Sequence, residues 1–211
     1  MNHIVVLIMA AGSASRFGSP KQLACWQGKS LLAHAIENAA NVKHLMESAV
    51  DDEVTVHCRV VLGAYAEQIE EHIGQHVNWL SVIRVRNWQS GLGRSIAEAV
   101  KQLNKDVDAV LILLADQPRV SAGTLQNIVE SYMETQTAPA LDSAIACVYP
   151  NGSPGVPALF PKSHFHQLKR LTGDLGAKPL LGEAKLVELA MQDALLDVDT
   201  REDLLRLDQP T

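Results

Sequence analysis

A short apolar run near the start of the chain breaks at once into a loop of small residues that carries two cations. Ile4–Met9 predicts a buried strand, and the segment that follows, ending at Lys21, reads AAGSASRFGSPK. Small side chains let backbone N–H groups approach an anion, and we expect a helix from about Ser30 to add the positive end of its dipole. Arg16 can grip phosphate oxygens as a planar fork, whereas Lys21 is a compact point charge. This strand and loop therefore predict a phosphate-binding turn and, with it, a nucleotide site.

Two common phosphate motifs do not fit this chain. A Walker A loop ends in Gly-Lys-Ser/Thr, as Gly28-Lys29-Ser30 does, but Leu23 occupies the position of its first glycine. The dinucleotide-binding fingerprint also fails, because Ala14 replaces its second glycine and no acidic residue closes the following strand. The mismatches exclude a P-loop and disfavour a hydride-transfer enzyme.

Apolar, β-branched runs alternate with helical patterns along the first two thirds of the chain. This alternation predicts an α/β fold with a mainly parallel sheet covered on both faces. Ligands of such sheets lie beyond the carboxyl ends of the strands, so the Gly12 loop and Asp116 are expected to share one pocket. From Asn151 to Pro157 the sequence predicts turns. The predicted strands are Ile4–Met9, Val54–Leu62, Leu80–Val85, Val107–Leu114 and Ser143–Val148, and the predicted helices are Ser30–Ala40, Ala64–Ile73, Leu92–Leu103 and Ala122–Thr135.

The composition is typical of a soluble globular protein. With 211 residues, 47% of them hydrophobic, the chain is expected to form a single domain over residues 1–211. Cys25, Cys58 and Cys147 match no zinc spacing and no disulfide framework, so we expect a cytoplasmic location. No stretch reaches the roughly 20 apolar residues of a membrane helix. The formal charge of −6 argues against a nucleic-acid partner, so we expect neither a nucleic-acid nor a membrane partner.

The N-terminal loop resembles the signature of the pyrophosphorylase-like nucleotidyltransferases, which runs Ala-Ala-Gly, three residues, Arg, then Gly and Lys. Further segments are similar to those of the molybdenum cofactor cytidylyltransferase branch and follow in that family's order. The resemblance spans nearly the whole chain and implies a three-layer, Rossmann-like nucleotidyltransferase fold with a mainly parallel, mixed sheet. It also implies that the N-terminal half mainly binds the nucleotide and the C-terminal half mainly binds the acceptor. The segments are Leu114-Ala115-Asp116-Gln117-Pro118, Gly173-Asp174-Leu175-Gly176-Ala177-Lys178 and Asp197-Val198-Asp199-Thr200.

Acidic residues at two of these segments are candidate metal ligands. Asp116 ends a predicted buried strand, where a carboxylate suits Mg²⁺ bound to substrate phosphates; its alternative role is an Asx turn or a helix cap. Asp197 and Asp199 would face the same side of a strand, although Asp199-Thr200 could instead cap the final helix. The resemblance implies Mg²⁺ on Asp116 and Asp199, and the choice between Asp197 and Asp199 stays open.

The resemblance also implies roles for residues that contact the two substrates. Gly91 and Ser95, at the start of a predicted helix, would lie near the nucleobase and ribose; a plain helix start is the alternative. Gly152–Pro157 and Gly173–Lys178 would face the acceptor, with Asp174 or Lys178 near the pterin, and Val156 stands where many relatives have His. The residues implied to hold the triphosphate are Ala10, Ala11, Gly12, Ser13, Arg16 and Lys21.

The reaction that the resemblance implies is magnesium-dependent transfer of CMP from CTP to a molybdopterin-type phosphate acceptor, with release of pyrophosphate. Lys21, Arg16 and Asp116 would be its catalytic residues, and a molybdoenzyme or its chaperone is a candidate partner. The Ala10-Ala11-Gly12 form favours CTP over GTP. Alternatives are another nucleotidyltransferase, acting on a sugar phosphate or methylerythritol phosphate or using GTP to make the cofactor guanylyl derivative, and a non-catalytic nucleotide sensor or cofactor-delivery chaperone.

Overall fold

The computed structural model describes residues 2–48, 54–74, 80–136, 143–149, 151–182, 185–187 and 197–208. In these residues a sheet runs in the order β5-β4-β1-β6-β8-β7-β9. Strand β8 is antiparallel to both of its neighbours, and the other neighbouring pairs are parallel. The predicted mainly parallel, mixed sheet is therefore confirmed. The strands are β1 (Asn2–Ala10), β4 (Val54–Leu62), β5 (Leu80–Arg84), β6 (Ala109–Leu114), β7 (Ile145–Val148), β8 (Pro154–Pro161) and β9 (Lys185–Val187).

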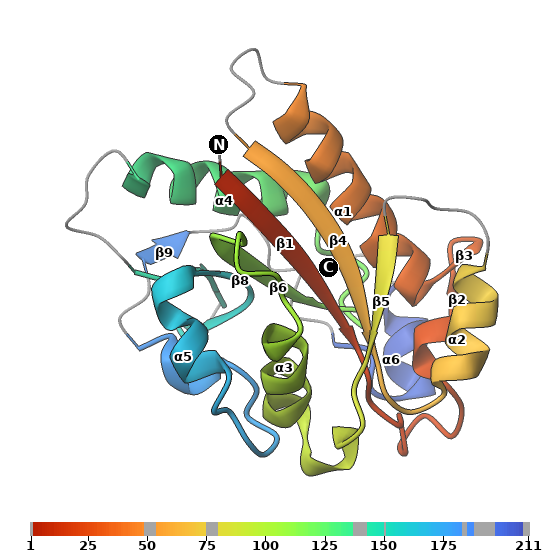
Figure 1. Cartoon of the computed structure of the whole chain (residues 1–211). Helices are drawn as coiled ribbons and strands as arrows, with labels where there is room; N and C mark the ends of the chain where they lie inside the picture. Colours follow the sequence, from red (N-terminus) through yellow and green to blue (C-terminus); the bar gives the residue numbers. More distant parts are fainter. Residues whose placement is uncertain are drawn as a thin grey trace.

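Helices cover both faces of the sheet, which gives the three layers visible in Figure 1. Successive side chains of a strand point to opposite faces, so Ile4, Val6 and Ile8 of β1 belong to one core, whereas Val5 and Leu7 belong to the other. The first core is covered by α1 (Leu31–Glu47), α2 (Ala66–Ile73) and α4 (Ala122–Gln136). The second is covered by α3 (Leu92–Lys101) and α5 (Phe165–Leu168).

Strand β8 occupies part of the segment that the sequence predicted as turns. The reversal is confined to the residues just before it, where the Gly152 N–H donates to the Tyr149 carbonyl over 2.7 Å. Pro154 and Pro161 lie at the two ends of the strand, and Pro157 lies where its register with β7 shifts. Proline lacks a donor for the ladder, and strand ends and bulges are the places that tolerate it. The prolines therefore mark an irregular strand.

A two-stranded hairpin separates the N-terminal loop from α1. Strands β2 (Cys25–Trp26) and β3 (Lys29–Ser30) pair antiparallel, and both residues of the turn between them, Gln27 and Gly28, have positive φ. Such a turn suits glycine at its second position. Ser30 then caps α1 by accepting the Ala33 N–H over 3.2 Å. The Gly-Lys-Ser sequence that resembled the end of a Walker A loop is a hairpin and a helix cap.

A third, small core joins the two ends of the chain. Phe17 of the N-terminal loop, Leu31 at the start of α1, and Val198 and Leu207 on either side of α6 (Arg201–Arg206) are buried together. The guanidinium of Arg201 also lies 5.7 Å from the centre of the Phe17 ring. Burial of these apolar groups brings the segment before α6 against the loop, although the two are far apart in the sequence.

The described residues contain neither a disulfide nor a helix that is long and apolar enough to cross a bilayer. Cys25 is exposed, whereas Cys58 and Cys147 are buried, and all three are free thiols. Burial raises the pKa of Cys147 to about 12 and that of Cys58 further still. The two buried cysteines are therefore inert packing residues, because the thiolate is the reactive form.

Candidate active site

The carboxyl ends of β1 and β6 open into one cavity of about 350 Å³. Apart from Asp197, the alternative metal ligand, every residue that the sequence predicted for the triphosphate, the metal or the nucleoside lies on its wall. We call the side formed by the Gly12 loop and the acidic residues the loop end, and the side formed by the start of α3 the helix end. The loop end comprises Ala10, Ala11, Gly12, Ser13, Ala14, Ser15, Arg16, Lys21, Gln22, Asp116 and Asp199; the helix end comprises Trp88, Gln89, Gly91, Leu92, Ser95 and Asp174.

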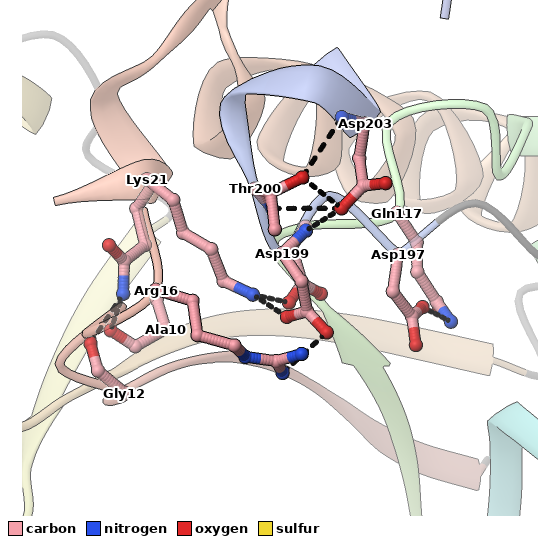
Figure 2. Close-up of polar contacts among 11 residues, drawn as sticks. Ala10, Gly12, Arg16, Lys21, Gln117, Asp197, Asp199, Thr200 and Asp203 are labelled. Atoms are coloured by element: carbon pink, nitrogen blue, oxygen red, sulfur yellow. Dashed lines mark hydrogen bonds and ion pairs between the residues drawn. The ribbon is translucent and has the colours of Figure 1, made fainter. Parts of the chain in front are cut away.

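Lys21 lies between two carboxylates at the loop end. Its Nζ is 2.5 Å from Oδ2 of Asp116 and 2.8 Å from Oδ1 of Asp199, and its side chain is 13% exposed. Figure 2 shows the ammonium group pointing at Asp199. Burial alone would lower the pKa of Lys21, but the two carboxylates outweigh it and raise that pKa above its ordinary value. The ammonium group therefore stays charged at neutral pH.

Arg16 pairs with Asp199 at the open rim of the same site. Its guanidinium Nη2 lies 2.7 Å from Oδ2 of Asp199, and its side chain is 70% exposed. Burial acts to raise the pKa of Asp199, but the hydrogen bond and charge of Lys21, together with Arg16, bring that pKa below its ordinary value. Asp199 is therefore an ionised carboxylate that contacts both cations of the loop.

The capping of α6 leaves Asp199 available to the cavity. Oγ1 of Thr200 accepts the Asp203 N–H over 3.2 Å, and Oδ2 of Asp203 accepts the Thr200 N–H over 2.8 Å, which is a complete capping box. The Val198 N–H donates to the carbonyl of Asp116 over 3.0 Å, which fixes this segment to the end of β6. The two roles predicted for Asp199-Thr200 are thus divided between them: Thr200 caps the helix, and Asp199 faces the cavity.

Asp116 does not cap the helix that follows it. The N-terminus of α4 is capped by Ser121, whose Oγ accepts the Thr124 N–H over 3.2 Å. Oδ1 of Asp116 is buried and accepts no hydrogen bond from the described residues. Asp116 and Asp199 converge on one position, which Lys21 Nζ contacts, and they present oxygen atoms only. This donor set fits Mg²⁺ or a similar cation, which binds through one or two carboxylates and completes its shell with phosphate oxygens and water.

Asp197 lies in a different hydrogen-bond network. Its Oδ1 accepts from Nε2 of Gln117 over 2.8 Å, and Nε2 of Gln117 is also 3.3 Å from the Tyr149 hydroxyl. That hydroxyl donates to the carbonyl of Val156 over 2.8 Å. Figure 2 shows the Gln117–Asp197 pair apart from the Lys21 cluster. Of the two candidate ligands that the sequence left open, Asp199 is therefore the one on the cavity wall.

Gln22 holds the N-terminal loop in shape and is a residue that sequence reasoning missed. Its side chain is buried, and its Nε2 donates to the carbonyls of Ala10 over 3.0 Å and Gly12 over 2.9 Å. These bonds tie both ends of the Ala10–Gly12 turn to one buried side chain. The signal for this role in the sequence was the glutamine itself, because an anion-binding loop does not require an amide side chain directly after Lys21.

Close backbone contacts build the helix end. Gly91 has φ +97°, and a Cβ added there would lie 2.4 Å from the carbonyl carbon of Gly173. The Gly93 N–H donates to the Gly173 carbonyl over 2.8 Å. Ser95 is buried, and its Oγ donates to the Gly91 carbonyl over 3.3 Å. The loop after α5 is thus seated on the start of α3, beside which it lies in Figure 1.

One expectation about this cavity is wrong, and another holds for only part of the predicted residues. The dipole of α1 was expected at the phosphate loop, but the β2–β3 hairpin displaces its first turn, and the start of α3 lines the cavity instead. Of the segments expected to face the acceptor, Asp174 is on the cavity wall, whereas Lys178 and the Gly152–Pro157 segment are not.

Comparison with known proteins places the chain in a family. Residues 6–189 match the family described as the MobA-like NTP transferase domain. The bifunctional protein GlmU of Desulfitobacterium hafniense (strain DSM 10664 / DCB-2) is 30% identical over 146 residues, which cover 68% of this chain and 29% of that protein. The chain thus spans under a third of the length of this relative.

Solved structures show the same fold over almost the whole chain. Rv0371c from Mycobacterium tuberculosis H37Rv superposes with a TM-score of 0.74 at 26% identity, covering 98% of this chain and 97% of that one. The complex of Rv0371c with manganese superposes with a TM-score of 0.71, at the same identity and coverage. These likenesses confirm the Rossmann-like nucleotidyltransferase fold. By its sequence match, its fold and the cavity at the carboxyl edge of its sheet, the chain belongs to the MobA-like NTP transferase family, and hence to the nucleotidyltransferase class that the sequence predicted.

Proposed function

We propose that this chain is a divalent-metal-dependent nucleotidyltransferase that transfers CMP from CTP to a molybdopterin-type molybdenum cofactor and releases pyrophosphate. One observation carries the proposal: the small-residue loop, its two cations and the carboxylates of Asp116 and Asp199 line a single cavity. In this assignment the C-terminal half mainly binds the acceptor. The free thiols support a cytoplasmic location.

Charge neutralisation is the main catalytic task of the loop end. The attacking phosphate of the acceptor must approach an α-phosphate that is already anionic, and two unit charges 4 Å apart repel by about 4 kcal/mol at an effective dielectric constant of 20. Lys21 stays protonated because two carboxylates raise its pKa, so it can neutralise the transferring or attacking phosphate. Arg16 and the N–H groups of the Gly12 loop hold the departing pyrophosphate. Placement of charge, with no protein nucleophile, then supplies the catalysis.

Asp116 and Asp199 are the residues that would hold the divalent cation, for which we propose Mg²⁺. Their oxygens converge on one position, and Oδ1 of Asp116 has no described partner. Such a cation would supply charge withdrawal from the phosphate oxygens. The manganese complex of Rv0371c supports a divalent cation in this fold.

The identity of the two substrates rests on the sequence resemblance. Ala10-Ala11-Gly12 favours CTP over GTP, because one extra side chain changes how closely a base edge can approach the loop. Val156 replaces the histidine of many cytidylyltransferases and favours a second candidate, transfer to another phosphorylated acceptor. A sugar phosphate and methylerythritol phosphate are examples of such acceptors.

The deciding experiment incubates the purified protein and Mg²⁺ with each of the four NTPs and molybdopterin cofactor, while pyrophosphate and the dinucleotide product are monitored. We expect product with CTP and little with the other three. Product with GTP would reassign the base, and product with another acceptor would reassign the acceptor. Tight nucleotide binding without any pyrophosphate release would instead favour a sensor or a delivery chaperone.

A further inference from the structure

Asp174 differs from the other acidic residues of the cavity. Among the described residues on the cavity wall, Asp116 and Asp199 each pair with a loop cation, whereas no described cation or hydrogen-bond donor pairs with Asp174. Its carboxylate is exposed at the helix end. An unpaired carboxylate is unexpected in a cavity with the features of a triphosphate site, because it repels phosphate oxygens.

Backbone contacts bring this carboxylate to the start of α3. A Cβ added to Gly91 would be 2.5 Å from Oδ1 of Asp174, so the carboxylate rests directly on the start of α3. The Gly93 N–H holds the preceding carbonyl, that of Gly173, over 2.8 Å. Gly176 is also closely packed, because an added Cβ would lie 2.8 Å from Cδ2 of Leu92. Asp174 therefore stands on a loop that is seated on α3 over several residues.

The chemistry of a carboxylate limits what Asp174 can contact on a nucleotide. An ionised carboxylate only accepts hydrogen bonds, and it repels phosphate oxygens. The uncharged donors of an NTP are the ribose hydroxyls and the N–H groups of the base. Arg16 and Lys21 attract the phosphates to the loop end, so the nucleoside is the part left for the helix end.

We propose that Asp174 accepts a hydrogen bond from the nucleoside part of the bound NTP and thereby orients the nucleotide in the cavity. The proposal rests on the proposed function, and in it Asp174 contacts the nucleotide rather than the pterin. Gly91 is glycine for a matching reason, since any side chain there would occupy the place of this carboxylate and of Gly173.

The test measures nucleotide binding by calorimetry with Mg²⁺ and without acceptor. Asp174→Ala and Asp174→Asn are compared with the wild type and with Leu175→Ala, a control on the same loop whose side chain is 70% exposed. The probes are CTP, 2′-deoxy-CTP and inorganic triphosphate; if another NTP binds more tightly, it replaces CTP. We expect Asp174→Ala to weaken CTP binding by about tenfold, the scale of a charge-assisted hydrogen bond. Triphosphate should bind as tightly as before or more tightly.

Each outcome decides the inference. A loss confined to CTP identifies the ribose 2′-hydroxyl as the donor, and an equal loss for CTP and 2′-deoxy-CTP identifies the base or the 3′-hydroxyl; both support the proposal. Parallel weakening of CTP and triphosphate overturns it, as does unchanged CTP binding in both Asp174 variants. If the wild-type protein binds none of the four NTPs, the proposed function is overturned as well. If the wild type binds CTP and both Asp174 variants bind it equally tightly, only this inference is overturned.

Discussion

At the loop end of the cavity, Lys21 lies between Asp116 and Asp199, and ionic contacts join side chains from opposite ends of the chain. At the helix end, Gly91 and Gly173 touch through their backbones, with no room for a side chain at residue 91. The first arrangement depends on charge, and the second depends on shape. Substitutions of the loop-end charges should therefore change turnover and respond to pH, whereas a side chain at Gly91 should lower stability at every pH.

The largest expected effect is that of Lys21→Ala on turnover. Removal of one positioned charge from a transferring group typically costs about 10²- to 10³-fold in rate, so kcat for pyrophosphate release should fall by roughly that factor. The affinity for the NTP should change less, because the loop N–H groups and Arg16 remain. Steady-state kinetics separate the two effects.

Lys29→Ala is the matched control for this variant, because Lys29 pairs with Glu37 on the surface and its side chain is 49% exposed. It should leave kcat unaltered. If Lys21→Ala raised KM but kept kcat, Lys21 would be a binding residue only, and the loop end would lose its catalytic role.

The second effect is the loss of stability in Gly91→Ala. The backbone at residue 91 has φ +97°, and the added Cβ would lie 2.4 Å from the carbonyl of Gly173. Strain of this kind costs on the order of 1–3 kcal/mol, and the clash adds to it. We expect the free energy of unfolding to fall by at least about 2 kcal/mol in urea denaturation.

Gly182→Ala provides the comparison, because nothing lies within 4 Å of a Cβ added at that position and its φ is not positive. Its free energy of unfolding should stay within about 0.5 kcal/mol of the wild type. If the two variants were equally stable, the backbone at the helix end would adapt to an added side chain, and close backbone contact would not be what holds this end together.

Of the two ends of the cavity, the loop end was easier to predict from the sequence, because the types of its residues indicate its chemistry. A buried run followed by small residues, Arg16 and Lys21 indicates an anion site, and the rule that ligands lie beyond the carboxyl ends of strands places Asp116 beside it. The layered α/β fold follows from the same alternation of strands and helices. No pattern in the sequence, however, tells Asp197 from Asp199, because the hydrogen bonds of Gln117 and Thr200 separate their roles.

The helix end and the second half of the sheet were harder to predict. The contact between Gly91 and Gly173 joins two loops, and loops have no hydrophobic period that reveals their partners. Strand β8 was hidden because its prolines normally indicate turns, and only the paired strands show that they lie at its ends and at a register shift. The hairpin before α1 was missed since each of its strands has two residues, and the missing hairpin led to the wrong helix dipole at the loop.

A smaller effect is expected from Thr200→Ala, which tests whether α6 holds Asp199 in place. Loss of an N-cap costs about 1 kcal/mol, and the free energy of unfolding should fall by that amount. Activity should fall further than this loss of stability explains, because Asp199 precedes the cap directly. Thr200→Ser keeps the capping oxygen and should restore both properties. Full activity of the Ala variant would show that the Val198–Asp116 backbone bond suffices to place Asp199.

The smallest effect is the pH dependence of the loop-end ion pairs. Lys21 and Arg16 hold the pKa of Asp199 below its ordinary value of 3.8. A carboxyl group with a depressed pKa in the folded state stabilises the protein above its unfolded pKa, and this contribution disappears as the pH falls through the folded pKa. Asp199→Asn should therefore be less stable than the wild type by under about 1 kcal/mol at neutral pH, since the pair is partly exposed to solvent. Denaturation measured from pH 7 to pH 3 should show the difference constant above about pH 5 and shrinking below about pH 4. Over the same range the deficit of Gly91→Ala should stay nearly constant, because its main causes, the positive φ and the contact with the Gly173 carbonyl, involve no ionisable group. A deficit of Gly91→Ala that shrank in parallel would show that the two ends of the cavity are coupled, and that charge supports the helix end too.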